Sequence, residues 1–271
     1  MAQPSIAFLE LEPASEQRPL PGRRLAFSPR PLGLGTLVVV PTYNECSNLA
    51  AFVAAVLRAA PAAHVLVVDD NSPDGTGALA AALSARDARV HVLHRPSKLG
   101  LGTAYVAGFR WGLSRSYARF FEMDADFSHE PCELERFFEA LDAGAELVVG
   151  SRNVPGGRVF GWGLGRLLLS KGGSAYSRAV LGVAVRDLTT GYKAFTRSAL
   201  ERLGLDAIRS NGYAFQIETT FRALCAGVEV VEVPITFVDR RVGQSKMDRR
   251  IFAEAVSVVW RLRLDKSRSK L

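Results

Sequence analysis

Two aspartates two positions apart are the residues most suited to chemistry, and they end an apolar segment in the run Met123-Asp124-Ala125-Asp126. Oxygen ligands of this kind suit Mg²⁺ or Mn²⁺, which bridge to phosphate oxygens. Such an ion would neutralise the charge on a departing diphosphate. A solvated acidic turn explains the same two residues, and a D-x-D pair is a weak motif when it stands alone.

Acceptor and aromatic side chains follow two earlier apolar segments. In the run 41–45, Tyr43 offers an aromatic face, and Glu45 offers acceptors to a base or a ribose. In the run 69–76, Asp74 is explained as a cap of the next helix, whereas Asp70 is not and could accept hydrogen bonds from a ribose or a base. A polar turn that starts a helix is the plainer interpretation of the first run when it is taken alone.

Basic residues later in the chain could bind the phosphates. Arginine binds phosphate through two nitrogens, whereas lysine acts as a point charge. Opposite a metal and a diphosphate, such residues would complete an electrostatic clamp. Scattered surface charge on a basic protein is the alternative interpretation. The residues concerned are Arg152, Arg166 with Ser170 and Lys171, and Asp239-Arg240 with Lys246.

These residues need elements that bring them together, and the first half of the chain supplies an alternating pattern. Strands are predicted at 37–40, 65–68, 90–93, 120–123 and 147–149. Helices are predicted at about 48–60, from the turn at 71–75 to about residue 85, at 103–116 and at 133–143. Strands alternating with helices indicate βαβ units and a mostly parallel sheet. In such a sheet the carboxyl ends of the strands face the ligand crevice, so the acidic runs are expected at one edge.

The second half of the chain is predicted to elaborate the same sheet. A glycine-rich loop at 156–165 is expected before a helix at 166–181 that Gly172-Gly173 interrupts. A helix at 215–226 and a long strand at 228–238, with Pro234 inside it, follow. We predict an N-terminal arm without order at 1–35, a catalytic domain at 36–250, and an amphipathic helix with a basic tail at 251–271.

Composition excludes several classes of protein. The 271 residues are 48% hydrophobic with a net charge of +7 and a pI near 9.6, so the chain is globular and suits an anionic partner. Three distant cysteines exclude a disulfide scaffold and are expected as small core side chains. With no apolar run of 18 residues and no signal core, a cytoplasmic protein is expected. Nucleic acid is disfavoured because the acidic strand ends would repel phosphate.

Four strand-end motifs in the same order are stronger than any one of them. The runs 41–45, 68–76, 98–102 and 123–126 resemble those of the inverting family 2 glycosyltransferases, and more closely those of the dolichyl- (polyprenyl-) phosphate mannose synthases. Later runs at 150–152, 166–170, 187–193 and 238–246 agree with this resemblance. It implies a single α/β domain of the GT-A (Rossmann-like) type, with a mostly parallel sheet flanked by helices and a C-terminal acceptor-binding elaboration.

The resemblance also implies roles, carried over by position. Asp124, Asp126 and Arg240 would be the catalytic residues, with Asp124 and Asp126 as ligands of Mg²⁺ or Mn²⁺. Some relatives have a further ligand, Gln, where Ser128 stands here, and a shorter hydroxyl leaves metal ligation at that position open. Arg166 and Ser170 would receive the acceptor phosphate. The donor GDP-mannose would be held by Pro41, Tyr43, Glu45, Val68, Asp70, Asp124, Ala125, Asp126, Arg152, Arg240 and Lys246.

The expected reaction is transfer of mannose from GDP-mannose to a polyprenyl phosphate with inversion. The acceptor is a lipid, and the mixture of leucine, tryptophan and basic residues in 160–185 suits a segment at a membrane surface, although a buried helix with a polar edge explains it equally well. We therefore expect a protein at the cytoplasmic face of a membrane, with room for a membrane-anchoring subunit. The alternatives are another donor, such as UDP-glucose, and a non-catalytic nucleotide-sugar-binding subunit.

Overall fold

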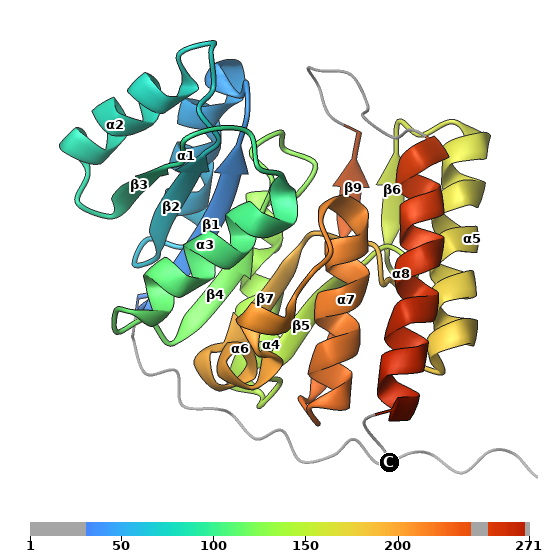
Figure 1. Cartoon of the computed structure of the whole chain (residues 1–271). Helices are drawn as coiled ribbons and strands as arrows, with labels where there is room; N and C mark the ends of the chain where they lie inside the picture. The colour runs from blue at the N-terminus through green and yellow to red at the C-terminus, as the bar shows by residue number, and fades with distance from the viewer. Residues whose placement is uncertain (1–30, 240–248, 269–271) are drawn as a thin grey trace, which may run out of the picture. The chain divides into compact units, whose positions relative to one another are not determined.

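A seven-stranded sheet forms the centre of the computed structural model, which describes residues 31–239 and 249–268. Its strand order is β3-β2-β1-β4-β7-β5-β8 (Figure 1). All pairs are parallel except those that β7 makes with β4 and β5. The strands are β1 (Thr36–Thr42), β2 (His64–Asp69), β3 (Val90–His94), β4 (Arg119–Glu122), β5 (Leu147–Ser151), β7 (Lys193–Thr196) and β8 (Val230–Pro234). The predicted mostly parallel sheet and its first five strands are therefore confirmed.

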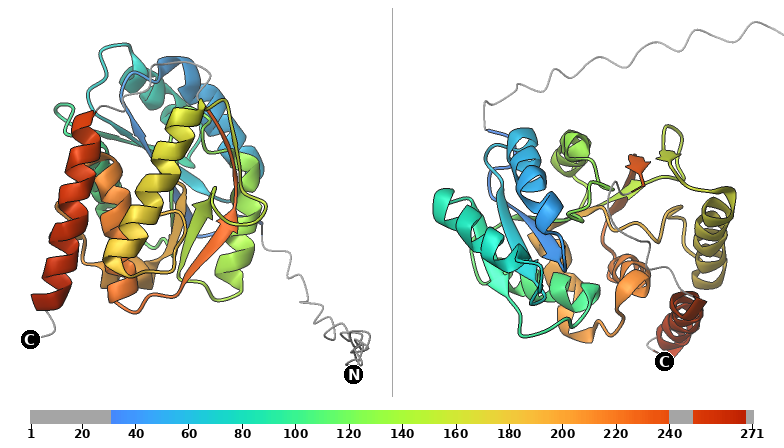
Figure 2. Two further views of the ribbon diagram at one scale, coloured as in Figure 1. Left: turned by 90° about the vertical axis from the view of Figure 1, so that its right-hand side faces the viewer. Right: turned by 90° about the horizontal axis from the view of Figure 1, so that it is seen from above.

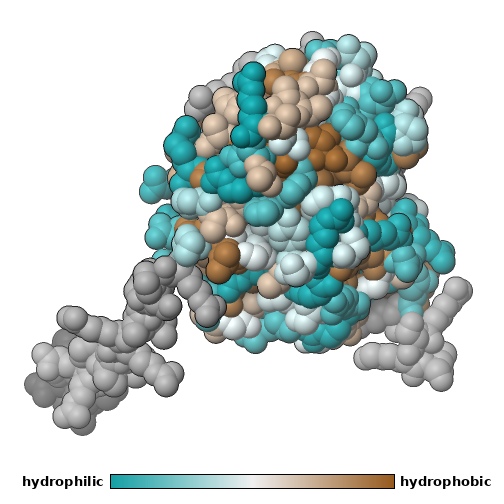
Figure 3. All heavy atoms as spheres, turned by 90° about the vertical axis from the view of Figure 1, so that its left-hand side faces the viewer, coloured by the Kyte–Doolittle hydropathy of each residue, from teal (hydrophilic) through white to brown (hydrophobic). Residues whose placement is uncertain are grey.

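Helices cover both faces of this sheet. One apolar cluster joins the sheet to α1 (Cys46–Ala59), α2 (Thr76–Arg86) and α4 (Leu134–Asp142), which follows the short helix η1 (Pro131–Glu133). A second cluster joins the other face to α3 (Leu101–Leu113), α6 (Arg197–Leu203) and α7 (Gly212–Cys225), with η2 (Leu205–Ala207) between the last two. The face that carries α2 and the edge strand β3 mixes hydrophilic and hydrophobic areas (Figure 3).

A third apolar cluster attaches two further helices beside α7. It joins α5 (Leu164–Leu181), α7 and α8 (Arg249–Arg268), which lie side by side in Figure 2. From α8 the cluster includes Val258, Val259 and Leu262. The predicted amphipathic C-terminal helix therefore exists, although Trp260 lies outside its buried face. Residues 1–30 of the predicted arm lie outside the described residues, as do residues 240–248 and 269–271.

The second half differs from the sequence expectations in three places. The long strand predicted at 228–238 is two strands, because Pro234 has no N–H to continue a ladder. After it, β9 (Thr236–Val238) pairs with β6 (Arg158–Phe160), which lies inside the predicted loop. Helix α5 runs without a break through the two glycines at 172 and 173. The expectation of core cysteines is also wrong, since Cys132 and Cys225 are exposed and Cys46 is half-buried.

Two glycines let α3 lie close against the sheet. A Cβ at Gly108 would collide with Val39, and one at Gly112 would come within 2.6 Å of Leu37 and Phe120. Side chains at these positions would push the helix away from β1 and β4. The close approach fixes the first turns of α3 beside the carboxyl ends of these strands, where the acidic residues lie.

A pair of histidines at the other end of the sheet predicts a pH-dependent stability. His64 Nδ1 and His91 Nε2 lie 3.0 Å apart, and the Tyr117 hydroxyl is 2.8 Å from His64. Burial lowers the pKa of both imidazoles, aided by Arg89 at His64 and by His64 at His91. The folded state therefore binds fewer protons than the unfolded chain, so this stability is complete above about pH 6.5 and is lost as the pH falls through the folded pKa.

We accordingly expect the melting temperature to fall more steeply between about pH 7 and about pH 5 in the natural protein than in a His91→Gln variant. Calorimetric melting at both pH values measures the difference. His94→Gln is the matched control, because His94 is exposed on the same strand. Parallel slopes for the natural protein and His91→Gln would contradict the assignment.

Candidate active site

A cavity of about 340 Å³ opens at the carboxyl ends of β1, β2 and β4. The strand order reverses between β1 and β4, and ligands of open α/β sheets bind at such a point. The cavity brings together the three acidic runs that the sequence analysis singled out. Its lining residues are Pro41, Thr42, Tyr43, Glu45, Asp70, Lys98, Gly100, Leu101, Ala104, Asp124, Ala125, Asp126, Thr189, Gly191, Gly212 and Gln216.

Both aspartates of the D-x-D run line this cavity, directly after β4 ends. The Tyr105 hydroxyl donates to Asp124 Oδ1 at 3.1 Å, and the Asp124 amide donates to His129 Nδ1 at 3.1 Å. The buried Asp126 accepts from the Ser128 amide at 3.0 Å. Phe127 between them has a φ of 61°, a left-handed conformation that turns the chain sharply. Each carboxylate is thus held in place by its neighbours.

The donor set of this run fits a divalent cation. Two carboxylates face one cavity, and Mg²⁺ is usually held by one or two carboxylates together with substrate phosphates. Within residues 31–239 and 249–268, no group of three or more His, Cys, Asp or Glu side chains is arranged to hold a metal. Water or a bound phosphate would supply further ligands.

The opposite wall carries the residues predicted to bind the nucleoside. The Lys98 ammonium lies 4.0 Å from the centre of the Tyr43 ring, and Glu45 accepts from Asn48 at 3.0 Å. Asp70 forms a 2.9 Å ion pair with Arg95 and accepts from the amides of Leu99 and Gly100. Asp70 therefore fixes the loop that closes this side of the cavity. The sequence predicted a contact of Asp70 with a ribose or a base, but not this structural role.

Of the three apolar members of the predicted donor set, Val68 and Ala125 are buried and Pro41 is half-buried. Ala125 lies between the aspartates and lines the cavity, as does the half-buried Pro41. The Val68 side chain packs in the core between β2 and α3 and is not among the lining residues. Only the backbone of Val68 could therefore contact a ligand in this cavity.

Arg152 lies behind the cavity wall rather than in it. Its guanidinium donates to both carboxylate oxygens of Asp187, at 2.7 and 2.8 Å, and to Thr189 Oγ1 at 2.9 Å. Although burial opposes ionisation, Arg152 holds the pKa of the Asp187 carboxyl below its usual value. Because Thr189 lines the cavity, this ion pair is one residue away from it.

Arg166 and Ser170 lie one turn apart on α5, as their predicted joint role requires. Both carboxylate oxygens of Asp239 accept from Arg166 at 2.9 Å. Arg166 and Arg152 meet at the Trp162 ring, with guanidinium carbons 4.4 and 5.3 Å from its centre. Arg240 and Lys246, which the sequence analysis placed in this set, lie outside the described residues.

Three buried polar groups beneath the site, namely Glu122, Lys193 and Tyr105, are absent from the sequence predictions. Burial raises the pKa of Glu122 to about 7 and lowers that of Lys193, its partner across the β4–β7 ladder, to about 8. Tyr105 is buried, and burial together with Asp124 raises the pKa of its hydroxyl. Burial lowers the pKa of His129, which keeps the ring neutral to accept from Asp124. Only His129, three residues past the D-x-D run, carried a signal in the sequence.

Comparison with known proteins agrees with this geometry. The polyprenol monophosphomannose synthase of Mycolicibacterium smegmatis is 55% identical over 238 residues, which cover 86% of this chain and 90% of that protein. The undecaprenyl-phosphate mannosyltransferase of Micrococcus luteus is 51% identical over 225 residues, covering 83% and 92%. Matches of this length must include the segment that contains α5.

The solved structures show the same fold. The glucosyl-3-phosphoglycerate synthase of Mycobacterium tuberculosis, solved with Mn²⁺ and UDP-glucose, superposes with a TM-score of 0.57 at 20% identity, covering 83% of this chain and 76% of that one. The predicted GT-A type is therefore confirmed. The family model for glycosyl transferase family 2 matches residues 37–204. This range includes all the lining residues of the cavity from Pro41 to Gly191. The chain is a glycosyltransferase and belongs to family 2.

Proposed function

We propose that this protein transfers mannose from GDP-mannose to a polyprenyl phosphate with inversion. The observation that carries the proposal is the meeting of Tyr43, Glu45 and Asp70 with Asp124 and Asp126 in one cavity. The names of the two bacterial relatives support the sugar and the lipid phosphate. An aromatic ring and acceptors on one wall suit a nucleoside, and paired carboxylates on the other suit a diphosphate with its metal.

Asp124 and Asp126 would hold Mg²⁺ or Mn²⁺, which supplies charge neutralisation to the diphosphate when it is bound. The solved fold neighbour that contains Mn²⁺ is consistent with this assignment. Tyr105, His129 and Ser128 keep the two carboxylates in place before the donor arrives. Electrostatic groups that are positioned in advance need no reorganisation at the moment of reaction.

The acceptor phosphate would enter beside Trp162. Arg166 with Ser170 would hold its oxygens, and Arg152 would face it or the donor from behind Thr189. A phosphate oxygen attacks C1 of the sugar while the bond from C1 to the diphosphate breaks, and the diphosphate leaves with the electron pair. The acceptor is already anionic near neutral pH, so positioning replaces a strong general base.

A membrane surface is the expected location of a lipid acceptor. Within the described residues, no helix is both long enough and apolar enough to cross a bilayer. Helix α5 instead exposes Leu164 and Leu168, which are 79% and 70% accessible. We call Leu164, Leu168 and the exposed Phe160 the apolar edge, and such side chains suit attachment at the interface, with or without an anchoring subunit.

A donor screen tests the proposed reaction. Purified protein with Mg²⁺ or Mn²⁺ and a short polyprenyl phosphate in detergent should form lipid-linked sugar from GDP-mannose. UDP-glucose should give a kcat/KM at least about 100-fold lower, because the polar groups that bind one base are left unpaired by another. The readout is transfer of labelled sugar to the lipid phase. Preference for UDP-glucose would replace the donor, and GDP binding without transfer to any acceptor would indicate a non-catalytic subunit.

A further inference from the structure

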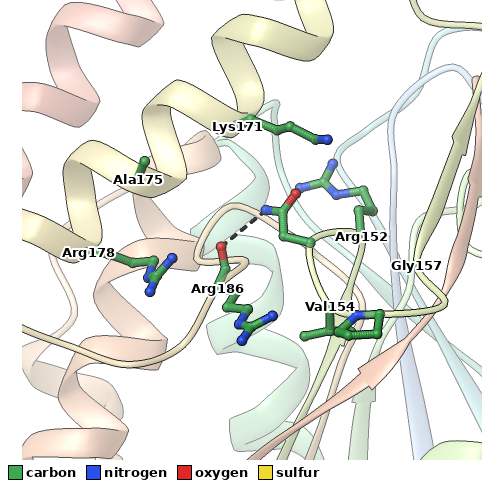
Figure 4. A pocket seen from close by; sticks show the side chains of 9 residues that line it. Arg152, Val154, Gly157, Lys171, Ala175, Arg178 and Arg186 are labelled. Carbon is green, nitrogen blue, oxygen red and sulfur yellow. Dashed lines mark hydrogen bonds between the residues drawn. The ribbon is translucent and has the colours of Figure 1, made fainter. Parts of the chain in front are cut away.

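A second cavity, of about 630 Å³, lies on the far side of Arg152 from the active site. Figure 4 shows Lys171 and Arg178 extending from α5 toward the opposite wall, where Arg152 and Arg186 lie. The Asn153 side chain donates to the Arg186 carbonyl at 3.1 Å and ties the two loops of that wall together. We call this cavity the basic pocket; its lining residues are Arg152, Asn153, Val154, Pro155, Gly157, Lys171, Ala175, Arg178 and Arg186.

The charge of the basic pocket is not balanced from within. None of its lining residues is acidic. The two nearby carboxylates are already occupied, because Asp187 pairs with Arg152 and Glu232 accepts from the amides of Arg186 and Asp187. In the part of the chain that the structure describes, Lys171, Arg178 and Arg186 form no ion pair, and the buried Nε of Arg178 has no hydrogen-bond partner. Three cations around one cavity, one of them with an unpartnered buried donor, suit an anionic ligand.

The same face of α5 carries the apolar edge. Leu164, Leu168, Lys171, Ala175 and Arg178 follow one another at intervals of four and three residues, so they form one stripe along the helix. Its first turn presents leucines, and its later turns present the cations of the basic pocket. At a lipid surface the leucines can insert among the acyl chains while the nearby cations bind lipid phosphates. Binding of a soluble phosphate would not involve the leucines.

We infer that the basic pocket binds the phosphate headgroup of an anionic membrane phospholipid, separately from the acceptor phosphate. This inference deepens the membrane part of the proposed function and concerns binding, not transfer. A headgroup held by Lys171, Arg178 and Arg186 would set the rotation of α5 against the bilayer. Arg166 and Ser170, on another side of the same helix, would then face an acceptor whose phosphate lies at the same depth.

The test compares binding of the full chain to vesicles of phosphatidylcholine alone with binding to vesicles in which about a third of the lipid is phosphatidylglycerol. Neither vesicle contains polyprenyl phosphate, and no donor is added. Arg178→Gln/Arg186→Gln should weaken binding to the anionic vesicles about 30-fold and leave binding to the neutral ones nearly unchanged. The matched control is Arg58→Gln/Arg86→Gln, which removes the same charge from exposed positions on α1 and α2 and should cost less than about threefold.

Equal losses in the two double variants would overturn the inference, because net charge alone would then explain binding. If the natural protein bound inorganic phosphate but bound the anionic vesicles no more tightly than the neutral ones, the inference would also be overturned, in favour of a soluble ligand. Transfer in detergent is measured in parallel. The pocket variant should retain it, and its loss there would assign the basic pocket to the acceptor site instead. A natural protein that binds vesicles but shows no transfer would refute the proposed function and leave this inference standing.

Discussion

The Asp126→Ala variant should lose at least about 1000-fold in the rate of sugar transfer at saturating Mn²⁺. Asp126 is buried at the cavity wall and is one of two carboxylates there that fit a divalent cation. Without it, the charge that develops on the leaving diphosphate would be left largely uncompensated. Transfer of labelled mannose to a short polyprenyl phosphate measures the loss.

The matched control is Asp206→Ala, since Asp206 is an aspartate whose side chain is 92% exposed and pairs only with Arg110 among the described residues. It should transfer at the natural rate. Calorimetry of GDP binding separates the causes further, because the affinity of Asp126→Ala for GDP should no longer depend on Mn²⁺. Near-normal transfer by Asp126→Ala, or unchanged Mn²⁺-dependent GDP binding, would refute the role given to this run.

The part of the site that the sequence predicts is the part that local rules determine. Short runs of β-branched residues indicate buried strands, and in a parallel sheet the carboxyl ends of these strands lie at one edge. Tyr43, Asp70 and Asp124 follow such runs directly, so their shared cavity could be expected without knowing any contact. The hydrogen bond that Asp74 accepts from the Thr76 amide is also local, because the two residues are only two positions apart in the sequence.

What the sequence could not predict depends on pairing between distant segments. Strand β7 is only four residues long and enters the sheet antiparallel between β4 and β5, which no local pattern encodes. Glu122 and Lys193 become neighbours only through that pairing. Arg152 was predicted as a phosphate ligand from its place after β5. Its neutralisation by Asp187 depends on a contact across 35 positions.

The second large effect concerns that ion pair. Asp187→Asn should lower the free energy of unfolding by about 3–5 kcal/mol, because it leaves an uncompensated arginine in the interior. The Arg152 side chain is 7% exposed and that of Asp187 is fully buried. Denaturant unfolding at neutral pH measures the loss. Asp206→Asn removes the exposed partner of Arg110 and should cost no more than about 1 kcal/mol.

A double variant separates the structural use of Arg152 from its proposed use at the phosphates. In Arg152→Met/Asp187→Asn the buried charge is gone. The Arg152 and Thr189 amides donate to different oxygens of Asp187, so the single asparagine oxygen can still accept from one of them. We expect the double variant to be more stable than Asp187→Asn alone, because removing both charges removes the desolvated cation as well. Its transfer rate should nevertheless stay low. Recovery of transfer together with stability would show that Arg152 only supports the fold, whereas additive losses of stability would show that the two residues are not coupled.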